Sequence, residues 1–162
     1  HLPPHPPPNP HPHNPPLSHN PQKSSISMFS HEKLNAYKTA IEFNAWIHPI
    51  LEGIPKKLAA RDQLDRAATS MALNLAEGNG KFSKKDRARF WQIAHGSCLE
   101  CAACLDVLVA RKALLEENIS EGKELAESVA NMIFGLLDRL GVRIEEEPSE
   151  YGYSKDDDQE ED

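Results

Sequence analysis

Polar residues that are able to carry acid–base or ligand chemistry recur at helical spacing between residues 66 and 77. Arg66, Ser70, Asn74 and Glu77 fall in one narrow stripe when each residue turns the helix by about 100°. A neighbouring stripe on the same predicted helix is apolar and contains Leu64, Ala68, Met71 and Leu75. The polar stripe therefore runs beside the edge that the helix is expected to bury.

Two further polar residues, Ser97 and Glu100, lie on the next predicted helix and are expected to meet this stripe. One interpretation of the set is a ligand or catalytic site in which Glu77 and Glu100 exchange protons. The other is a structural polar network that fixes helix register, because buried polar groups have to be paired. We favour the network, and no catalytic residue, since no nucleophile, phosphate loop or oxyanion hole accompanies the two carboxylates. The predicted network comprises Arg66, Asn74, Glu77, Ser97 and Glu100.

Cysteines form the pattern C-x-x-C-x-x-C at Cys98, Cys101 and Cys104, inside a predicted helix. A tetrahedral zinc site takes four ligands and usually draws a pair of them from a turn. Small apolar core residues are therefore the favoured interpretation. A di-iron bundle uses Glu-x-x-His on two helices, and none of His31, His48 and His95 follows a Glu at that spacing. We predict no metal and no cofactor.

Basic residues crowd the segment that follows the polar stripe: Lys81, Lys84, Lys85, Arg87 and Arg89. Lys and Arg at the start of a helix oppose its dipole, which suggests that something other than stability placed them there. One interpretation is a nucleic-acid-binding surface that attracts phosphates in a salt-dependent way. The alternative is an ordinary solvated face, offset by Asp86.

The elements that position these residues are all helical, because apolar residues recur with helical periodicity from about residue 30 to 141 and nowhere alternate as in strands. Four helices are expected over residues 30–52, 59–77, 84–111 and 120–140. Ser83 should cap the third helix, Gly141 should end the fourth, and Gly78 to Gly80 should form a positive-φ turn. Short links make an all-α, antiparallel up-down-up-down four-helix bundle the natural topology for residues 30–143.

The first helix is expected to be apolar on two sides. Its predicted core stripe contains Leu34, Tyr37, Ile41, His48 and Leu51. A second stripe, formed by Phe43, Trp46 and Ile50, is placed on the opposite side. A helix with two apolar faces has to be covered twice, so the second stripe predicts an oligomer interface in a homo-oligomer.

The chain ends differ sharply from this body. Residues 1–29 are predicted to be a disordered leader, because residues 1–27 hold ten of the 13 prolines and five of the eight histidines. Met28 is the hypothesised translation start. Residues 144–162 are predicted to be a disordered acidic tail, with ten Asp/Glu against one Lys from Glu145 onward, whereas residues 28–143 hold 16 Lys/Arg against 15 Asp/Glu. The tail either solubilises the protein or competes with nucleic acid for the basic residues.

The sequence also indicates whether the chain enters a membrane and in which compartment it is found. No apolar run approaches the roughly 20 residues of a membrane-spanning helix, and no charged-then-apolar secretory pattern precedes the body. Three cysteines without such a pattern indicate a reducing, cytoplasmic location.

The run from Arg66 to Gly80, R-A-A-x-S-x-x-x-N-x-A-E-G-x-G, and the Gly96-Ser97-x-x-Glu100 element resemble the four-helix-bundle family of 23S rRNA intervening-sequence proteins. The resemblance spans roughly Leu34 to Leu140. It implies a compact four-helix bundle and a barrel-shaped homopentamer. Related accessory variability proteins of diversity-generating retroelements bind a reverse transcriptase and RNA, with a strongly basic body.

Together these observations predict a non-enzymatic, homo-oligomeric adaptor for RNA or for a nucleic-acid-processing enzyme such as a reverse transcriptase. The alternative is a structural or protein-interaction oligomer without affinity for nucleic acid.

Overall fold

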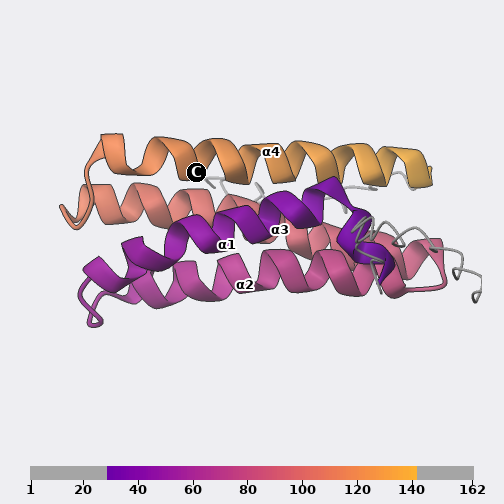
Figure 1. Ribbon diagram of the computed structural model, residues 1–162, viewed down its shortest axis with the longest axis horizontal. Helices are drawn as coiled ribbons and strands as arrows, with labels where there is room; N and C mark the ends of the chain where they lie inside the picture. The colour runs from indigo at the N-terminus through magenta and orange to yellow at the C-terminus, as the bar shows by residue number, and fades with distance from the viewer. Residues whose placement is uncertain (1–28, 142–162) are drawn as a thin grey trace, which may run out of the picture.

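The computed structural model describes residues 29–141, and within that range the chain is helical without any strand. It consists of a short 3-10 helix η1 (Ser30–Lys33) and the α-helices α1 (Asn35–Gly53), α2 (Ala59–Gly80), α3 (Lys84–Ala110) and α4 (Glu116–Leu140). Each α-helix packs against the next one in the chain, and α1 closes the bundle against α4 (Figure 1). The predicted up-down-up-down bundle is confirmed. Of the predicted leader only Phe29 is described, and the acidic tail lies outside the described residues.

The start of α3 and the end of α4 follow the local sequence, whereas the first helix begins at Asn35 and not at the predicted residue 30. The Ser83 hydroxyl caps α3 by accepting the Asp86 backbone N–H at 3.1 Å, and Gly141 ends α4 with a φ of 67°. The predicted positive-φ turn at Gly78–Gly80 is wrong, because both glycines continue α2 as ordinary helix. Gly78 serves close approach instead: a Cβ there would lie 2.6 Å from Cδ1 of Trp91.

The last helix begins earlier than predicted, at Glu116 rather than after Ser120. Asn118 supplies the N-terminal hydrogen bond, since its Oδ1 accepts the Leu115 backbone N–H at 2.9 Å.

The inward face of α1 differs from the one expected. Its buried residues are Ala36, Ala40, Phe43, Ile47 and Leu51, while Ile41 and His48 face solvent. Phe43 is 0% exposed, so the predicted oligomer interface at Phe43, Trp46 and Ile50 is wrong for Phe43. Trp46 and Ile50 are half-buried and pack against the core of the same chain. For these two residues the interface stays a prediction.

Two contacts show what sets the orientation of α1. The indole of Trp46 lies directly over Gly122 of α4, where an added Cβ would come within 2.1 Å of Cη2. On the other side, Nδ2 of Asn44 donates to the Ala68 carbonyl of α2 at 2.9 Å. A glycine opposite a tryptophan and an amide opposite a carbonyl therefore fix α1 between α4 and α2.

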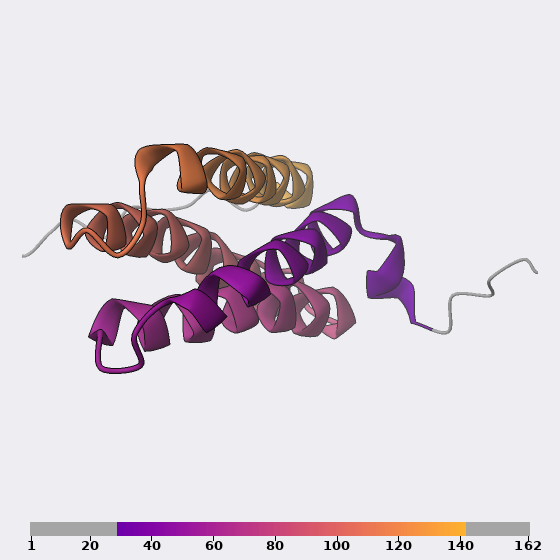
Figure 2. The same cartoon turned by 60° about the vertical axis from the view of Figure 1, so that its left-hand side comes forward.

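By length and composition alone, α3 qualifies as a membrane-spanning helix, with a mean hydropathy of 1.5 over its most apolar 18-residue window. No such segment is expected from the sequence, because Glu100 and Asp106 interrupt the apolar run. Core helices of water-soluble proteins pass the same test, and α3 packs against both α2 and α4. Figure 2 shows it enclosed on these two sides.

Candidate nucleic-acid interface

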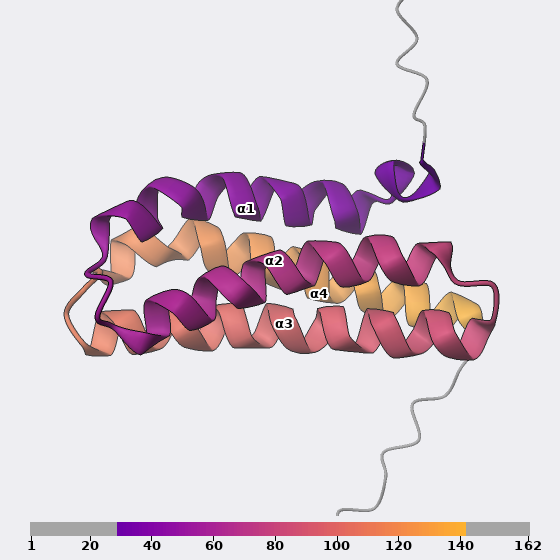
Figure 3. The same cartoon turned by 90° about the horizontal axis from the view of Figure 1, so that it is seen from below.

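The basic residues gather at one end of the bundle, around the turn that joins α2 to α3. Figure 3 shows that α4 ends at this same end, and that η1 lies there before α1 begins. The contact between η1 and α2 includes a hydrogen bond of 2.7 Å in which Nδ2 of Asn79 donates to the Ser30 hydroxyl. Both ends of the described chain therefore lie near the basic turn.

The turn itself is held by three of the predicted basic residues. Nε of Arg87 donates to the Lys81 carbonyl at 2.8 Å, which closes the turn. The Lys81 ammonium lies 3.4 Å from Oε1 of Glu77 and 4.6 Å from the centroid of the Phe90 ring. The Arg89 guanidinium lies 5.2 Å from the same ring. The hydrogen bond fixes the backbone of the turn. The Glu77 carboxylate and the Phe90 ring interact with the cations of Lys81 and Arg89, so these charges are partly satisfied within the protein.

The other two basic residues point away from the bundle. Lys84 and Lys85 lie in the first turn of α3 and are exposed. The ion pairs formed within residues 29–141 do not include them. Because their charges are not neutralised by a neighbour, these two lysines are the part of the cluster best able to contact phosphate.

Phe82, which the sequence analysis did not single out, occupies the tip of the turn. It has a relative exposure of 105%, above every other large apolar side chain in residues 29–141. The available signal was a lone aromatic residue between Lys81 and Ser83, outside any apolar periodicity. The turn therefore presents an apolar ring together with two unpaired cations.

The predicted polar network forms around a residue that the prediction left outside it, Ser70. The Asn74 amide donates to the Ser70 hydroxyl at 3.0 Å and to the Ser70 carbonyl at 2.9 Å. From α3, the Ser97 hydroxyl lies 2.9 Å from the Ser70 hydroxyl and 3.1 Å from the Ile93 carbonyl. Asn74 and Ser97 thus meet across the interface between α2 and α3, with Ser70 as the link.

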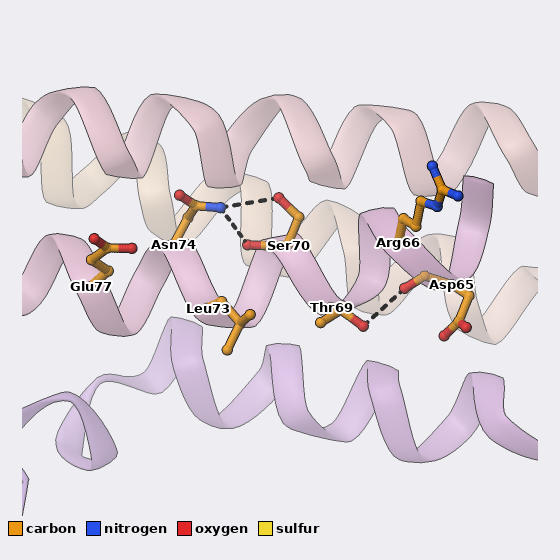
Figure 4. A pocket seen from close by; sticks show the side chains of 7 residues that line it. All are labelled: Asp65, Arg66, Thr69, Ser70, Leu73, Asn74 and Glu77. Atoms are coloured by element: carbon orange, nitrogen blue, oxygen red, sulfur yellow. Dashed lines mark hydrogen bonds between the residues drawn. The ribbon is translucent and has the colours of Figure 1, made fainter. Parts of the chain in front are cut away.

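The same prediction is wrong for Arg66 and Glu77. Both side chains are exposed and line a shallow surface pocket that runs from Asp65 to Glu77, and Figure 4 shows Arg66 reaching along the border with α3 without a hydrogen bond to the residues drawn there. Glu77 pairs with Lys81, whereas Glu100 accepts a hydrogen bond from Nε2 of Gln63. Gln63 precedes Glu77 by 14 positions, which is about 21 Å along a helix. The two carboxylates therefore do not form an acid–base pair.

The outer pocket on α2 brings together charges of both signs around an exposed leucine, Leu73. Its residues all come from one helix, so no second element encloses a bound molecule there.

The three cysteines lie in the bundle core as expected, each with a free thiol. Desolvation raises the pKa of Cys98 to about 12, and a hydrogen bond with its own backbone opposes part of the shift. The Cys98 thiol also donates to the Ala94 carbonyl at 3.3 Å. Burial also raises the pKa of Cys101 and Cys104. Within residues 29–141 no group of three or more His, Cys, Asp or Glu side chains is arranged to hold a metal ion.

Known proteins resemble this chain in sequence and in fold. The model of the 23S rRNA-intervening sequence protein family matches residues 32–135. A crystal structure from Bacteroides thetaiotaomicron, of a protein with unknown function from the S23 ribosomal protein family, superposes with a TM-score of 0.59. The two chains are 17% identical, and the match covers 63% of this chain and 97% of the other. No curated protein matches this chain.

Proposed function

This chain belongs to the 23S rRNA-intervening sequence protein family, and we propose that it is a non-enzymatic, cytoplasmic, homo-oligomeric adaptor that binds RNA through its α2–α3 turn. The observation that carries the proposal is that Lys84 and Lys85 form no ion pair within residues 29–141. Both lie on a turn whose backbone is held by hydrogen bonds. An RNA-processing or reverse-transcribing enzyme would then be recruited to the bound RNA.

Electrostatics favours this turn as the contact surface. Five cations lie within nine residues, and the nearby carboxylates are Glu77, which pairs with Lys81, and Asp86, which accepts from the Ser83 hydroxyl at 2.9 Å. Since residues 28–143 carry almost balanced charge, the turn is a local positive region. Phosphate binding to such a region releases counterions and depends on salt.

The direct test measures binding of a labelled RNA oligomer to the full chain at low salt. The Lys84→Gln/Lys85→Gln double variant should bind RNA at least tenfold more weakly than the unaltered protein. Lys56→Gln/Lys57→Gln is the matched control, because it removes two adjacent exposed lysines between α1 and α2, at the opposite end of the bundle. Equal losses in the two variants would refute the assignment to the α2–α3 turn.

The homo-oligomeric part of the proposal rests on a different surface. The outer side of α3 exposes Ile93, Leu99 and Val107, whereas its inner side packs on α2 and α4. A second copy is the occupant that we assign, because clusters of unlike charge lie at different positions along the bundle. The basic turn lies at one end, and the first half of α4 carries Glu116, Glu117, Glu121, Glu124 and Glu127 toward the other. Copies packed side by side and offset along the bundle would bring these unlike charges together.

Light scattering of the full chain tests this surface. The expected mass is a multiple of the 18.1 kDa chain, and the resemblance noted above implies a factor of five. Leu99→Lys, at a residue that is 58% exposed, should lower the mass. Leu115→Lys, at a 61% exposed leucine in the α3–α4 link, is the matched control and should leave it unchanged. A monomeric unaltered protein would refute self-association.

The same α3 surface also favours the second candidate function, a structural oligomer without nucleic-acid affinity. RNA binding at low salt distinguishes the two candidate functions. An oligomer that binds no RNA under this condition would have the purely structural function.

A further inference from the structure

The single exposed aromatic ring of the basic turn points to the form of nucleic acid that the turn recognises. None of the aromatic and cation–ring contacts formed within residues 29–141 involves Phe82. The other strongly exposed phenylalanines, Phe29 and Phe134, are 56% and 61% exposed, and Phe29 stacks on His31. Phe82 thus differs from them in having its whole ring open to solvent.

The backbone on both sides of Phe82 is fixed, so the ring is presented from an ordered position. Before it, the Lys81 N–H donates to the Gly78 carbonyl at 3.2 Å. After it, Ser83 caps α3, and the Arg87 side chain donates back to the Lys81 carbonyl at 2.8 Å. Such a turn loses little conformational freedom when a ligand binds.

Two cations follow the ring closely in the sequence. Lys84 and Lys85 follow Phe82 by two and three residues and belong to the first turn of α3. An aromatic ring beside unpaired cations is the combination with which proteins bind single strands, since a base stacks on the ring while its phosphates contact the cations. A duplex buries its base faces in the helical stack and offers no such partner.

We propose that the α2–α3 turn binds single-stranded RNA, with one unpaired base stacked on Phe82 and the adjoining phosphates on Lys84 and Lys85. This inference rests on the proposed RNA-binding function and adds the form of nucleic acid to it. Phe82 supplies affinity for unpaired bases, whereas the lysines supply affinity for any phosphate backbone.

The test compares a labelled single-stranded RNA with a blunt RNA duplex of equal length, using the full chain at low salt. Phe82→Ala should weaken single-strand binding about tenfold, the typical effect of losing one stacked base. Duplex binding should change less than twofold, and the salt dependence should stay the same because no charge is removed. Phe82→Trp should retain the affinity and show tryptophan quenching on single-strand binding.

Phe134→Ala is the matched control, because it removes an exposed phenylalanine from α4 and should not alter RNA binding. A single-stranded DNA of the same sequence should show the same loss with Phe82→Ala, since the stacked base is common to both. If Phe82→Ala binds single-stranded RNA normally while Lys84→Gln/Lys85→Gln does not, the stacking proposal is wrong and the proposed function stands. A lowered oligomer mass for Phe82→Ala would also overturn it, by showing that the ring contacts another copy.

Absence of all RNA binding by the unaltered protein would overturn the proposed function and this inference together.

Discussion

Burial governs the acidity of the three thiols of α3. Desolvation raises the pKa of Cys98 from 9.0 to about 12, and burial raises that of Cys101 as well. In the folded protein these thiols therefore stay protonated at pH values where they ionise in the unfolded chain. The folded state holds more protons above pH 9, so its stability falls as pH rises through that range.

We predict a loss in the free energy of unfolding of about 1.4 kcal/mol at pH 10 from Cys98 alone, relative to neutral pH. Urea denaturation at pH 7, 8, 9 and 10 would measure it. A variant with Cys98→Ala, Cys101→Ala and Cys104→Ala should show a flatter decline. An equally steep decline in this variant would contradict the assignment.

Single residues also show where sequence reasoning reaches its limit. Asn74 and Ser97 were predicted to meet, and they do so through Ser70. Arg66 and Glu77 share the same helical stripe, yet both are exposed, because the stripe is wide enough to span the edge of the contact with α3. Periodicity gives the face of a residue to within about one helical position, which is too coarse to separate a border residue from a buried one.

At the scale of elements, the closest helix contacts depend on two glycines. Gly78 of α2 receives the indole of Trp91, and Gly122 of α4 receives that of Trp46. Glycine within a helix is unfavourable by itself, so these positions are explained by the rings that lie against them. The tryptophans in turn set the spacing between α2 and α3 and between α1 and α4.

Gly122→Ala should destabilise the bundle by about 2–4 kcal/mol, because the new Cβ would overlap the Trp46 ring and force α1 to move. Gly135→Ala in the same helix has no atom within 4 Å of its added Cβ and should be neutral, or stabilising by up to about 1 kcal/mol. Thermal or urea unfolding of the two variants would compare them. Similar effects at both positions would contradict the close contact.

The positions of the helices were largely predictable, whereas the orientation of α1 was not. Capping at Ser83 and the glycine stop at Gly141 are local signals, and both are used. In contrast, α1 carries large apolar residues on both sides, such as Ile41 and Phe43, and its sequence does not say which side faces inward. That choice depends on Gly122 and Ala68, which lie on other helices and are distant in sequence.

At the scale of the whole molecule, topology places the end of α4 beside the basic turn, because α4 runs antiparallel to α3 (Figure 3). In the sequence, the acidic residues 145–162 begin four positions after Gly141. The acidic residues carry the charge to compete with RNA for Lys84 and Lys85.

Deletion of residues 145–162 should raise the RNA affinity severalfold at low salt and have little effect at high salt, where screening is strong. The deletion should matter less in the Lys84→Gln/Lys85→Gln background. A tail of equal length with its acidic residues changed to Asn and Gln separates charge from bulk. Unchanged affinity after deletion would show that the acidic residues do not compete.

The central claim, that RNA binds at the α2–α3 turn, is tested most directly by a salt titration of RNA affinity. For single strands, each phosphate contact contributes about −0.7 to the slope of log K against log salt. Lys84→Gln/Lys85→Gln should therefore reduce the magnitude of the slope by about 1.4, and Lys56→Gln/Lys57→Gln should leave it unchanged. A slope that is unaltered by loss of Lys84 and Lys85 would contradict the claim.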